Sequence, residues 1–413
     1  MIAADPKWDL MRSSPFPRPI HPFPARMAAS IPWDELQSPT PLRVLDPMAG
    51  SGTAAVIARI LGHEAIGMDM DPLAVQLAQG WCTAISAAAV RMSAASILKQ
   101  VSDRWKSLRG DETYPQDADD ETRKFVRYWF DITNRRQLRA FADSIGQIDE
   151  PDIQRVLWIA FSRLIITKEA GVSWARDLAH SRPHKVLKEP ERPLNIYLRE
   201  IEKVLQALQS VEQSASGRPL SEARIRRGDA RDLADIQSSS IDAIVTSPPY
   251  LNAIDYIRTS KFTLVWQGHP LSSLRRTRSQ LIGTEVQGQA LADAYDDVAK
   301  AMGAIGTLPQ RQQRLLFRYV DDMNRVFREF SRVLVPGGRV ILVIGDCAVR
   351  GVRIRNSSGL DALAKRHGLT PLKHNRRILP ANRRYLPPPS NGRTDLNARM
   401  RTEVVLRFQK SIH

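Results

Sequence analysis

The amino-acid sequence predicts an α/β fold with a mostly parallel sheet, a large helical insertion and an antiparallel hairpin at the C-terminal end. Three patterns predict it. Short apolar segments end in acids or prolines and lead through turns into apolar helices, as parallel strands and their crossover helices do. Residues 100–215 show mainly helical spacing, and residues 397–408 alternate like a strand. A chain of 413 residues can form one large domain with insertions, or two domains.

The composition is that of a globular protein with a basic surface. Hydrophobic residues make up 43% and charged residues 25%. Lys and Arg (60) outnumber Asp and Glu (44), and the net charge of +16 favours a polyanionic partner, nucleic acid rather than a membrane. Two distant cysteines, Cys82 and Cys347, exclude a disulfide framework and a cysteine metal site. With no signal-peptide pattern or membrane-length apolar run, we expect a soluble, cytoplasmic protein.

Helical spacing and proline content predict several further elements. Helices are expected at 151–170 and 195–213 in the insertion, and at 256–266 after it. A helix at 310–334 should stop at Pro336-Gly337-Gly338, which leads into a buried strand at 339–346. The N-terminal residues 1–27 are rich in proline and also apolar, which predicts an extended arm that packs on the protein.

A glycine-rich loop follows the first predicted strand, which ends at Asp46. The loop, Gly50-Ser51-Gly52, leads into a helix closed by Gly62. Such a loop lets a ligand approach the backbone and the free N–H groups of the helix. A phosphate-binding P-loop is disfavoured because no Lys follows the second glycine, and the dinucleotide glycine spacing is absent. Asp46 would repel a pyrophosphate but attract a cationic ligand.

A second strand, residues 64–69, also ends in an acid. Asp69 lies about twenty positions after the glycine loop, where an acidic side chain can hold ribose hydroxyls. Asp71 precedes a helix, and we expect it to be the N-cap.

An apolar strand at 241–245 stops abruptly at Thr246-Ser247-Pro248-Pro249-Tyr250. The prolines cannot continue the strand, so a stiff loop is expected at its carboxyl end, where open α/β sheets bind ligands. The loop contains a hydroxyl group, peptide carbonyls and a flat aromatic ring. These groups can bind a planar base through its amino group.

These motifs resemble those of class I S-adenosylmethionine-dependent methyltransferases, and Thr246 to Tyr250 narrows the resemblance to DNA methyltransferases that act on N4 of cytosine or N6 of adenine. The resemblance implies a Rossmann-like sheet. It also implies a first half (1–99) that binds S-adenosylmethionine, an insertion (100–215) that recognises the target, and a catalytic half (216–413) with a basic insertion at about 270–310. The implied catalytic residues are Ser247, Pro248, Pro249 and Tyr250. The implied cofactor-binding residues are Phe23, Pro24, Ala25, Asp46, Pro47, Ala49, Gly50, Gly52, Thr53, Asp69, Met70, Asp229 and Ala230. No metal is implied.

Ser247 favours cytosine as the target base, because the adenine enzymes of this family usually have Asp or Asn there. A carbon-5 cytosine enzyme would need a Cys nucleophile, typically after a proline, but Cys82 follows Trp81 and Cys347 follows Asp346. The alternatives are N6-adenine methylation, amino methylation of RNA such as tRNA guanine, and a nucleic-acid-binding protein on an inactive methyltransferase fold.

The expected partner is duplex DNA with the target base flipped out of the helix, and a restriction or defence system is a possible further partner. Candidate DNA contacts combine basic and aromatic side chains in three segments. They are Trp174, Arg176, His180, Arg182, Arg275, Arg276, Arg278, Arg383 and Arg384.

Overall fold

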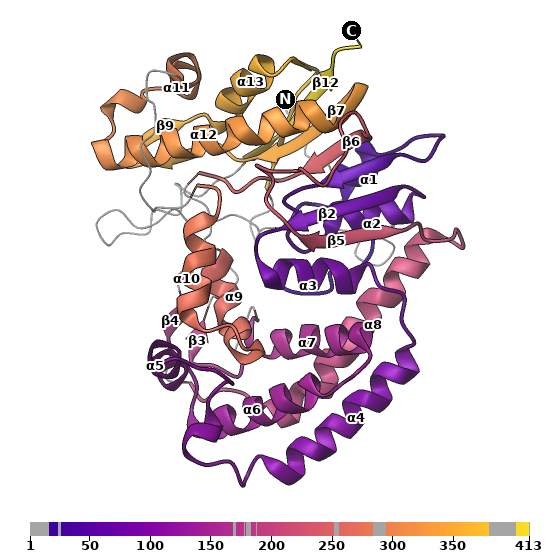
Figure 1. Ribbon diagram of the computed structural model, residues 1–413, viewed down its shortest axis with the longest axis vertical. Coiled ribbons are helices and arrows are strands. Elements are labelled where there is room, and N and C mark those ends of the chain that lie inside the picture. The colour runs from indigo at the N-terminus through magenta and orange to yellow at the C-terminus, as the bar shows by residue number, and fades with distance from the viewer. Residues whose placement is uncertain are drawn as a thin grey trace.

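The computed structural model describes residues 16–23, 26–167, 171–176, 178, 183–186, 188–251, 256–283, 295–379 and 402–412 (Figure 1). An eight-stranded sheet forms its centre, with the order β10-β12-β7-β6-β1-β2-β5 and β11 paired to β12. These strands are β1 (Arg43–Asp46), β2 (Glu64–Asp69), β5 (Ala223–Arg227), β6 (Ile241–Thr246), β7 (Leu334–Ile344), β10 (Leu369–Pro371), β11 (Asn375–Ile378) and β12 (Thr402–Lys410).

The sheet is mostly parallel with an antiparallel end. Strands β5, β2, β1, β6 and β7 pair in parallel, whereas β12 runs antiparallel to β7, β10 and β11. The predicted α/β fold with a C-terminal antiparallel hairpin is therefore confirmed.

Helices cover both faces of the sheet, because successive residues of a buried strand point to opposite faces. Val44 belongs to the apolar core on one face and Leu45 to the core on the other. Helices of the first face are α1 (Ser30–Glu35), α2 (Thr53–Ile60) and α3 (Pro72–Trp81). Helices of the second face are α11 (Asp296–Met302), α12 (Gln310–Val333) and α13 (Asn356–Arg366), which lie together in Figure 1.

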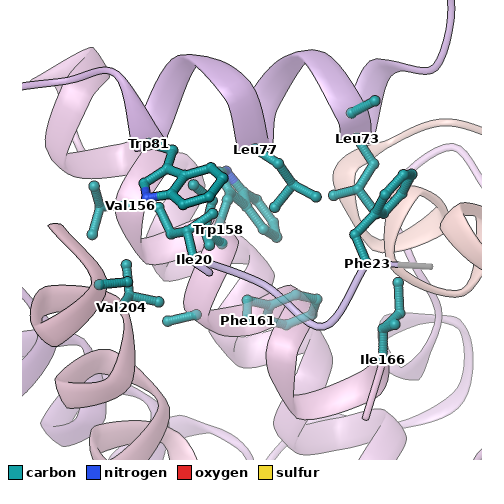
Figure 2. Close-up of a cluster of buried hydrophobic side chains, with 14 of the residues drawn as sticks. Ile20, Phe23, Leu73, Leu77, Trp81, Val156, Trp158, Phe161, Ile166 and Val204 are labelled. Atoms are coloured by element: carbon teal, nitrogen blue, oxygen red, sulfur yellow. The ribbon is translucent and has the colours of Figure 1, made fainter. Parts of the chain in front are cut away.

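The residues between β2 and β5 extend the first core. Their helices are α4 (Ala87–Arg104), η2 (Gly110–Thr113), α5 (Asp120–Trp129), α6 (Ile132–Gly146), α7 (Pro151–Ile165) and α8 (Pro193–Ala215), with a small hairpin of β3 (Ala175–Arg176) and β4 (His184–Lys185). In Figure 2, Leu77 and Trp81 of α3 lie beside Val156 and Phe161 of α7. The insertion is therefore packed onto the sheet's own helices.

The described part of the N-terminal arm, residues 16–23, packs on the protein as predicted, and residues 1–15 lie outside the described residues. Ile20 is fully buried, and the Arg18 amide donates a 2.7 Å hydrogen bond to Ser210 Oγ of α8. The Arg163 guanidinium of α7 donates to the Ile20 carbonyl at 2.9 Å. The arm is thus held by the insertion, and Figure 2 shows Ile20 and Phe23 against the same apolar cluster.

The remaining elements lie between residues 256 and 354. They are α9 (Tyr256–Leu264), η3 (Val265–Gln267), α10 (Leu271–Gln280), η5 (Ile305–Thr307), β8 (Cys347–Val349) and β9 (Val352–Ile354). Among the described residues, no helix combines the length and apolar character needed to cross a bilayer.

Several boundaries differ from the prediction. The helix expected at 151–170 ends at Ile165, and the one expected at 256–266 ends at Leu264, where a 3-10 turn follows. The strand after α12 begins at Leu334 and runs through the Pro-Gly-Gly turn, instead of beginning at Arg339. Pairing with β6 passes from Ile241↔Leu334 to Ala243↔Arg339, so five steps on β7 match two on β6. The extra residues form a bulge, with Gly337 at φ 78°, that keeps both ends of the segment hydrogen-bonded to β6.

Candidate functional site

The carboxyl ends of β1 and β6 meet at the centre of the sheet. The chain leaves β1 towards β2 on one side and later returns to β6 on the other, so the strand order reverses here. The Thr246 hydroxyl donates a 2.7 Å hydrogen bond to Asp46 Oδ1, and both side chains are buried. The glycine-rich loop and the Ser-Pro-Pro-Tyr loop therefore leave the sheet side by side.

Asp46 is a buried acid whose charge is not fully compensated. Burial raises the pKa of its carboxyl to about 7, against the opposing hydrogen bonds from Thr246 and the Met48 amide. The nearby Asp69 carboxylate raises this pKa further. A cation bound beside Asp46 would favour the ionised form, so the site suits a positively charged ligand.

The glycine loop closes tightly over α3. A Cβ on Gly52, which has φ 89°, would lie 2.8 Å from the Ala78 backbone, so only glycine fits there. At Gly50 an added Cβ would meet no atom of the described residues within 4 Å, which leaves that side of the loop open. Ser51 is buried, and its Oγ has no hydrogen-bond partner among the described residues. The loop thus offers open backbone and an unused hydroxyl.

The neighbouring predicted residues surround this loop. Ala49 donates its amide to the Met68 carbonyl at 2.8 Å and so ties the loop to the end of β2. Pro47 is buried in the turn after β1, and Thr53 is buried at the start of α2.

The end of β2 carries two acids with different tasks. Asp69 accepts hydrogen bonds from the Gly50 and Asp71 amides, both at 2.9 Å, and burial raises its pKa. Asp71 caps α3 through the Leu73 amide at 2.9 Å, as predicted, and it also accepts from Ser260 of α9. Burial and the Asp69 charge raise the pKa of Asp71 to about 7. Ser260 had no local signal in the sequence, since only folding brings it to α3.

Asp229 is held by an arginine that sequence reasoning did not single out. Arg231 binds both carboxylate oxygens, through Nε at 3.0 Å and Nη2 at 2.7 Å. Arg231 also donates to Asp322 of α12 and to the Gln280 carbonyl at the end of α10, both at 2.6 Å. The Arg231 Nη2 atom lies 4.0 Å from Met70 Sδ. Ala230, the residue before Arg231, is buried. The Arg231 backbone amide also donates to Oδ1 at 2.9 Å, and Nε is shared with Oδ2 at 3.1 Å. Three N–H groups of Arg231 therefore occupy most of the roughly four acceptor positions of this carboxylate and leave about one for a further donor.

The loop after β6 is anchored at both ends. Ser247 Oγ donates to the Val343 carbonyl of β7 at 3.2 Å, which leaves its lone pairs available to accept. Pro248 is buried, whereas Pro249 is partly exposed. The Tyr250 hydroxyl donates to Glu403 of β12 at 3.4 Å. The loop is therefore fixed to the two strands beyond it.

The arm residues lie against α9, which follows this loop. Phe23 stacks on Tyr256 with ring centroids 5.7 Å apart and an interplanar angle of 18°. Figure 2 places Phe23 beside Leu73 at the start of α3. The buried His21 bonds to Ser162 Oγ at 3.0 Å, and burial holds its pKa well below the ordinary value. Pro24 and Ala25 lie outside the described residues.

The predicted nucleic-acid contacts divide into three groups. Arg276 and Arg278 are exposed on α10, and Arg275 there forms an ion pair with Glu121 of α5. Trp174 is half-buried in the β3–β4 hairpin, and next to it Arg176 donates to the Ser173 and Ala175 carbonyls, so its guanidinium is partly used within the hairpin. His180, Arg182, Arg383 and Arg384 lie outside the described residues.

No protein-family model matches the sequence, and no curated protein matches it. Solved structures resemble the chain weakly. One, from Thermus thermophilus, is provisionally named a DNA modification methylase and is complexed with S-adenosyl-L-methionine; it is 21% identical, covers 45% of this chain and 51% of its own, and has a TM-score of 0.23. This chain thus aligns with only about half of that protein's length.

Two further structures align over most of the chain. A TehB-like SAM-dependent methyltransferase from Corynebacterium glutamicum is 10% identical, with 94% of this chain and 89% of its own covered and a TM-score of 0.31. The YcgJ protein from Bacillus subtilis is 11% identical, with 93% and 97% covered and a TM-score of 0.34. The chain's own strand order and antiparallel end carry the assignment of a Rossmann-like, class I methyltransferase type of fold.

Proposed function

We propose that the protein is an S-adenosylmethionine-dependent DNA methyltransferase that modifies N4 of cytosine. The hydrogen bond between Thr246 and Asp46 is the observation that carries the proposal, because it holds the Ser247 loop against the glycine-rich loop. A methyl-donor site and a base-gripping loop must be neighbours for direct transfer.

The residues around the glycine loop fit this cofactor. The site suits a ligand with a cationic centre and a ribose. It has an acid at the end of β1 and another at the end of β2, an open side at Gly50, and a Ser51 hydroxyl without a partner among the described residues. In the proposed arrangement Asp69 holds the ribose hydroxyls and Asp229 accepts from the adenine amino group. When bound, S-adenosylmethionine supplies a methyl group on a good sulfonium leaving group.

The Ser247 loop supplies the acceptors that cytosine requires. The exocyclic nitrogen is a poor nucleophile, because its lone pair is delocalised into the ring. Ser247 Oγ and the Pro248 carbonyl would accept hydrogen bonds from its two N–H groups and favour a tetrahedral nitrogen, which restores the lone pair. Because the Ser247 hydroxyl donates its hydrogen to the Val343 carbonyl, the lone pairs of its oxygen can accept a hydrogen bond from the base. Tyr250 would stack on the flipped base, and Pro249 keeps the loop stiff.

The identity of residue 247 supports cytosine over adenine. Methylation of adenine N6 and of RNA amino groups use similar loops and stay as alternatives. The +16 charge supports a nucleic-acid substrate, but it does not distinguish DNA from RNA.

Methyl transfer to duplex DNA tests the proposal. We expect wild-type protein to transfer label from S-adenosylmethionine to duplex DNA, and S247A to lose at least about a hundredfold in rate. Calorimetry should show that S247A and Y250A still bind the cofactor. The exposed Ser102 on α4 gives a matched control, S102A, expected to behave as wild type. Failure of wild-type protein to bind the cofactor would overturn the enzymatic proposal.

A further inference from the structure

One face of α5 carries a row of aromatic rings with cations placed over them. Glu121, Phe125 and Tyr128 are four and three residues apart and therefore share a face of the helix. The Lys261 ammonium of α9 lies 5.0 Å from the Phe125 ring centroid. The Lys185 ammonium of β4 lies 4.6 Å from that of Tyr128 and 5.9 Å from that of Trp174. We call Phe125, Tyr128, Trp174, Lys185, Lys261 and Arg275 the α5 stripe.

The α5 stripe runs from the edge of the core to the surface. Phe125 and Lys261 are partly buried, and Phe125 packs against the fully buried Phe262. Tyr128, in contrast, is 53% exposed, and Lys185 is also exposed. The ring holds the ammonium in place without removing it from solvent, so an anion can still reach it.

Hydrogen bonds join the stripe to the helix that follows the Ser247 loop. Thr259 of α9 donates to the Leu178 carbonyl next to the β3–β4 hairpin at 2.7 Å. The Trp174 amide donates to the Trp129 carbonyl of α5 at 2.8 Å, and the Leu271 amide of α10 donates to Thr122 Oγ1 of α5 at the same distance. Figure 1 shows α5, β3, β4, α9 and α10 grouped together. The stripe is therefore fixed relative to α9.

We propose that the α5 stripe binds the phosphate backbone of duplex DNA flanking the target base; this rests on the proposed function. From Glu121 to Tyr128 the helix rises by about 10 Å, which matches about three base-pair steps. Lys185 and Lys261 are aimed by the rings, and Arg275 completes the row at the α10 end. Glu121 holds Arg275 only through an exposed ion pair, which a phosphate can replace.

The salt dependence of duplex binding tests the proposal. Fluorescence anisotropy with a labelled duplex of about 30 base pairs, without cofactor, gives the slope of log K against log salt. K185Q should reduce the slope by about 0.9, and K185Q/K261Q by about 1.8, one phosphate contact for each lysine. K300Q removes an exposed lysine on α11 and is the matched control, with the wild-type slope expected.

The aromatic ring provides a second, charge-neutral test. Y128A should weaken duplex binding although it removes no charge, whereas Y128F should bind as wild type because the ring is kept. K185Q, K261Q and Y128A could all have the duplex affinity and salt slope of K300Q while wild-type protein still methylated the duplex. That result would overturn the proposed role of the α5 stripe and leave the proposed function standing. Binding of single-stranded DNA but not of duplex would also overturn it. Cofactor binding with no binding of any DNA would overturn both.

Discussion

Thr246 and Asp46 are joined by a 2.7 Å hydrogen bond between residues 200 positions apart in the chain. Because each is the last residue of its strand, the bond fixes the spacing of the two loops that follow. It also gives the Asp46 carboxyl group a hydrogen-bond donor, which this group needs because its burial keeps water away.

Replacing Thr246 by Val should destabilise the protein by about 1–3 kcal/mol, because Asp46 would lose its side-chain donor in a buried position. T246S keeps the hydroxyl and loses only a buried methyl group, so it should cost about 1 kcal/mol and less than T246V. Urea denaturation measures both. Equal stability of T246V and wild type would show that the bond does not hold the two strands together.

Cofactor affinity should rise with pH through the titration of Asp46. Its pKa is about 7 in the folded protein, and a sulfonium favours the ionised carboxylate. Below this pKa the ionised fraction falls tenfold per pH unit, so the affinity at pH 8 should exceed that at pH 6 by about tenfold. Calorimetry should also show proton release at pH 6. D46N should bind weakly with a flat pH profile; a D46N profile as steep as wild type would assign the titration to another group.

Stability should fall as pH rises through the range set by Asp71. Its folded pKa of about 7 lies above the ordinary value of 3.8, so the folded state binds more protons than the unfolded state between about pH 4 and 7. Stability is therefore lost as pH rises across that window. D71N keeps a capping side chain without the acid and should reduce the slope, leaving the part that Asp46 and Asp69 contribute through their own raised pKa values. The exposed Asp103 provides a control, D103N, which should keep the wild-type slope.

Breaking the support of Asp229 should weaken cofactor binding more than methyl transfer. R231K cannot bind both carboxylate oxygens and Asp322 at once, so Asp229 would lose its fixed orientation. The KM for S-adenosylmethionine should rise while kcat changes little, the opposite of the pattern expected for S247A. D322N, which removes only the distal carboxylate, should cost about 1.5–3 kcal/mol in stability and shift KM less than R231K. A fall in kcat alone for R231K would contradict this positioning role.

Local patterns predicted most of the fold and the strand ends around the glycine-rich loop. Asp71 could be identified as a helix cap because capping depends on neighbouring residues, and the strand ends could be located because proline and glycine act locally. The bulge around Gly337 was missed, since a Pro-Gly-Gly turn alone does not reveal that β6 continues to pair beyond it.

Contacts between distant segments could not be predicted in this way. Ser260, Arg231 and Asp322 are ordinary residues in their local sequence, and only the packing of α9 on α3 and of α12 on the sheet brings them to the site. Arg176 shows the converse: a basic residue in a promising loop donates to its own hairpin. Lys185 could not be singled out from the sequence, because only the folded chain places its ammonium group over the rings of Tyr128 and Trp174.

The central claim, that the Ser247 loop directs methylation to N4 of cytosine in DNA, is tested most directly by identifying the modified nucleoside. Duplex DNA treated with protein and S-adenosylmethionine is digested to nucleosides and analysed by mass spectrometry. The proposed mechanism predicts N4-methylcytosine with wild-type protein and S102A, and a rate of its formation at least about a hundredfold lower with S247A. N6-methyladenine without N4-methylcytosine, or methylation of RNA but not DNA, would contradict it.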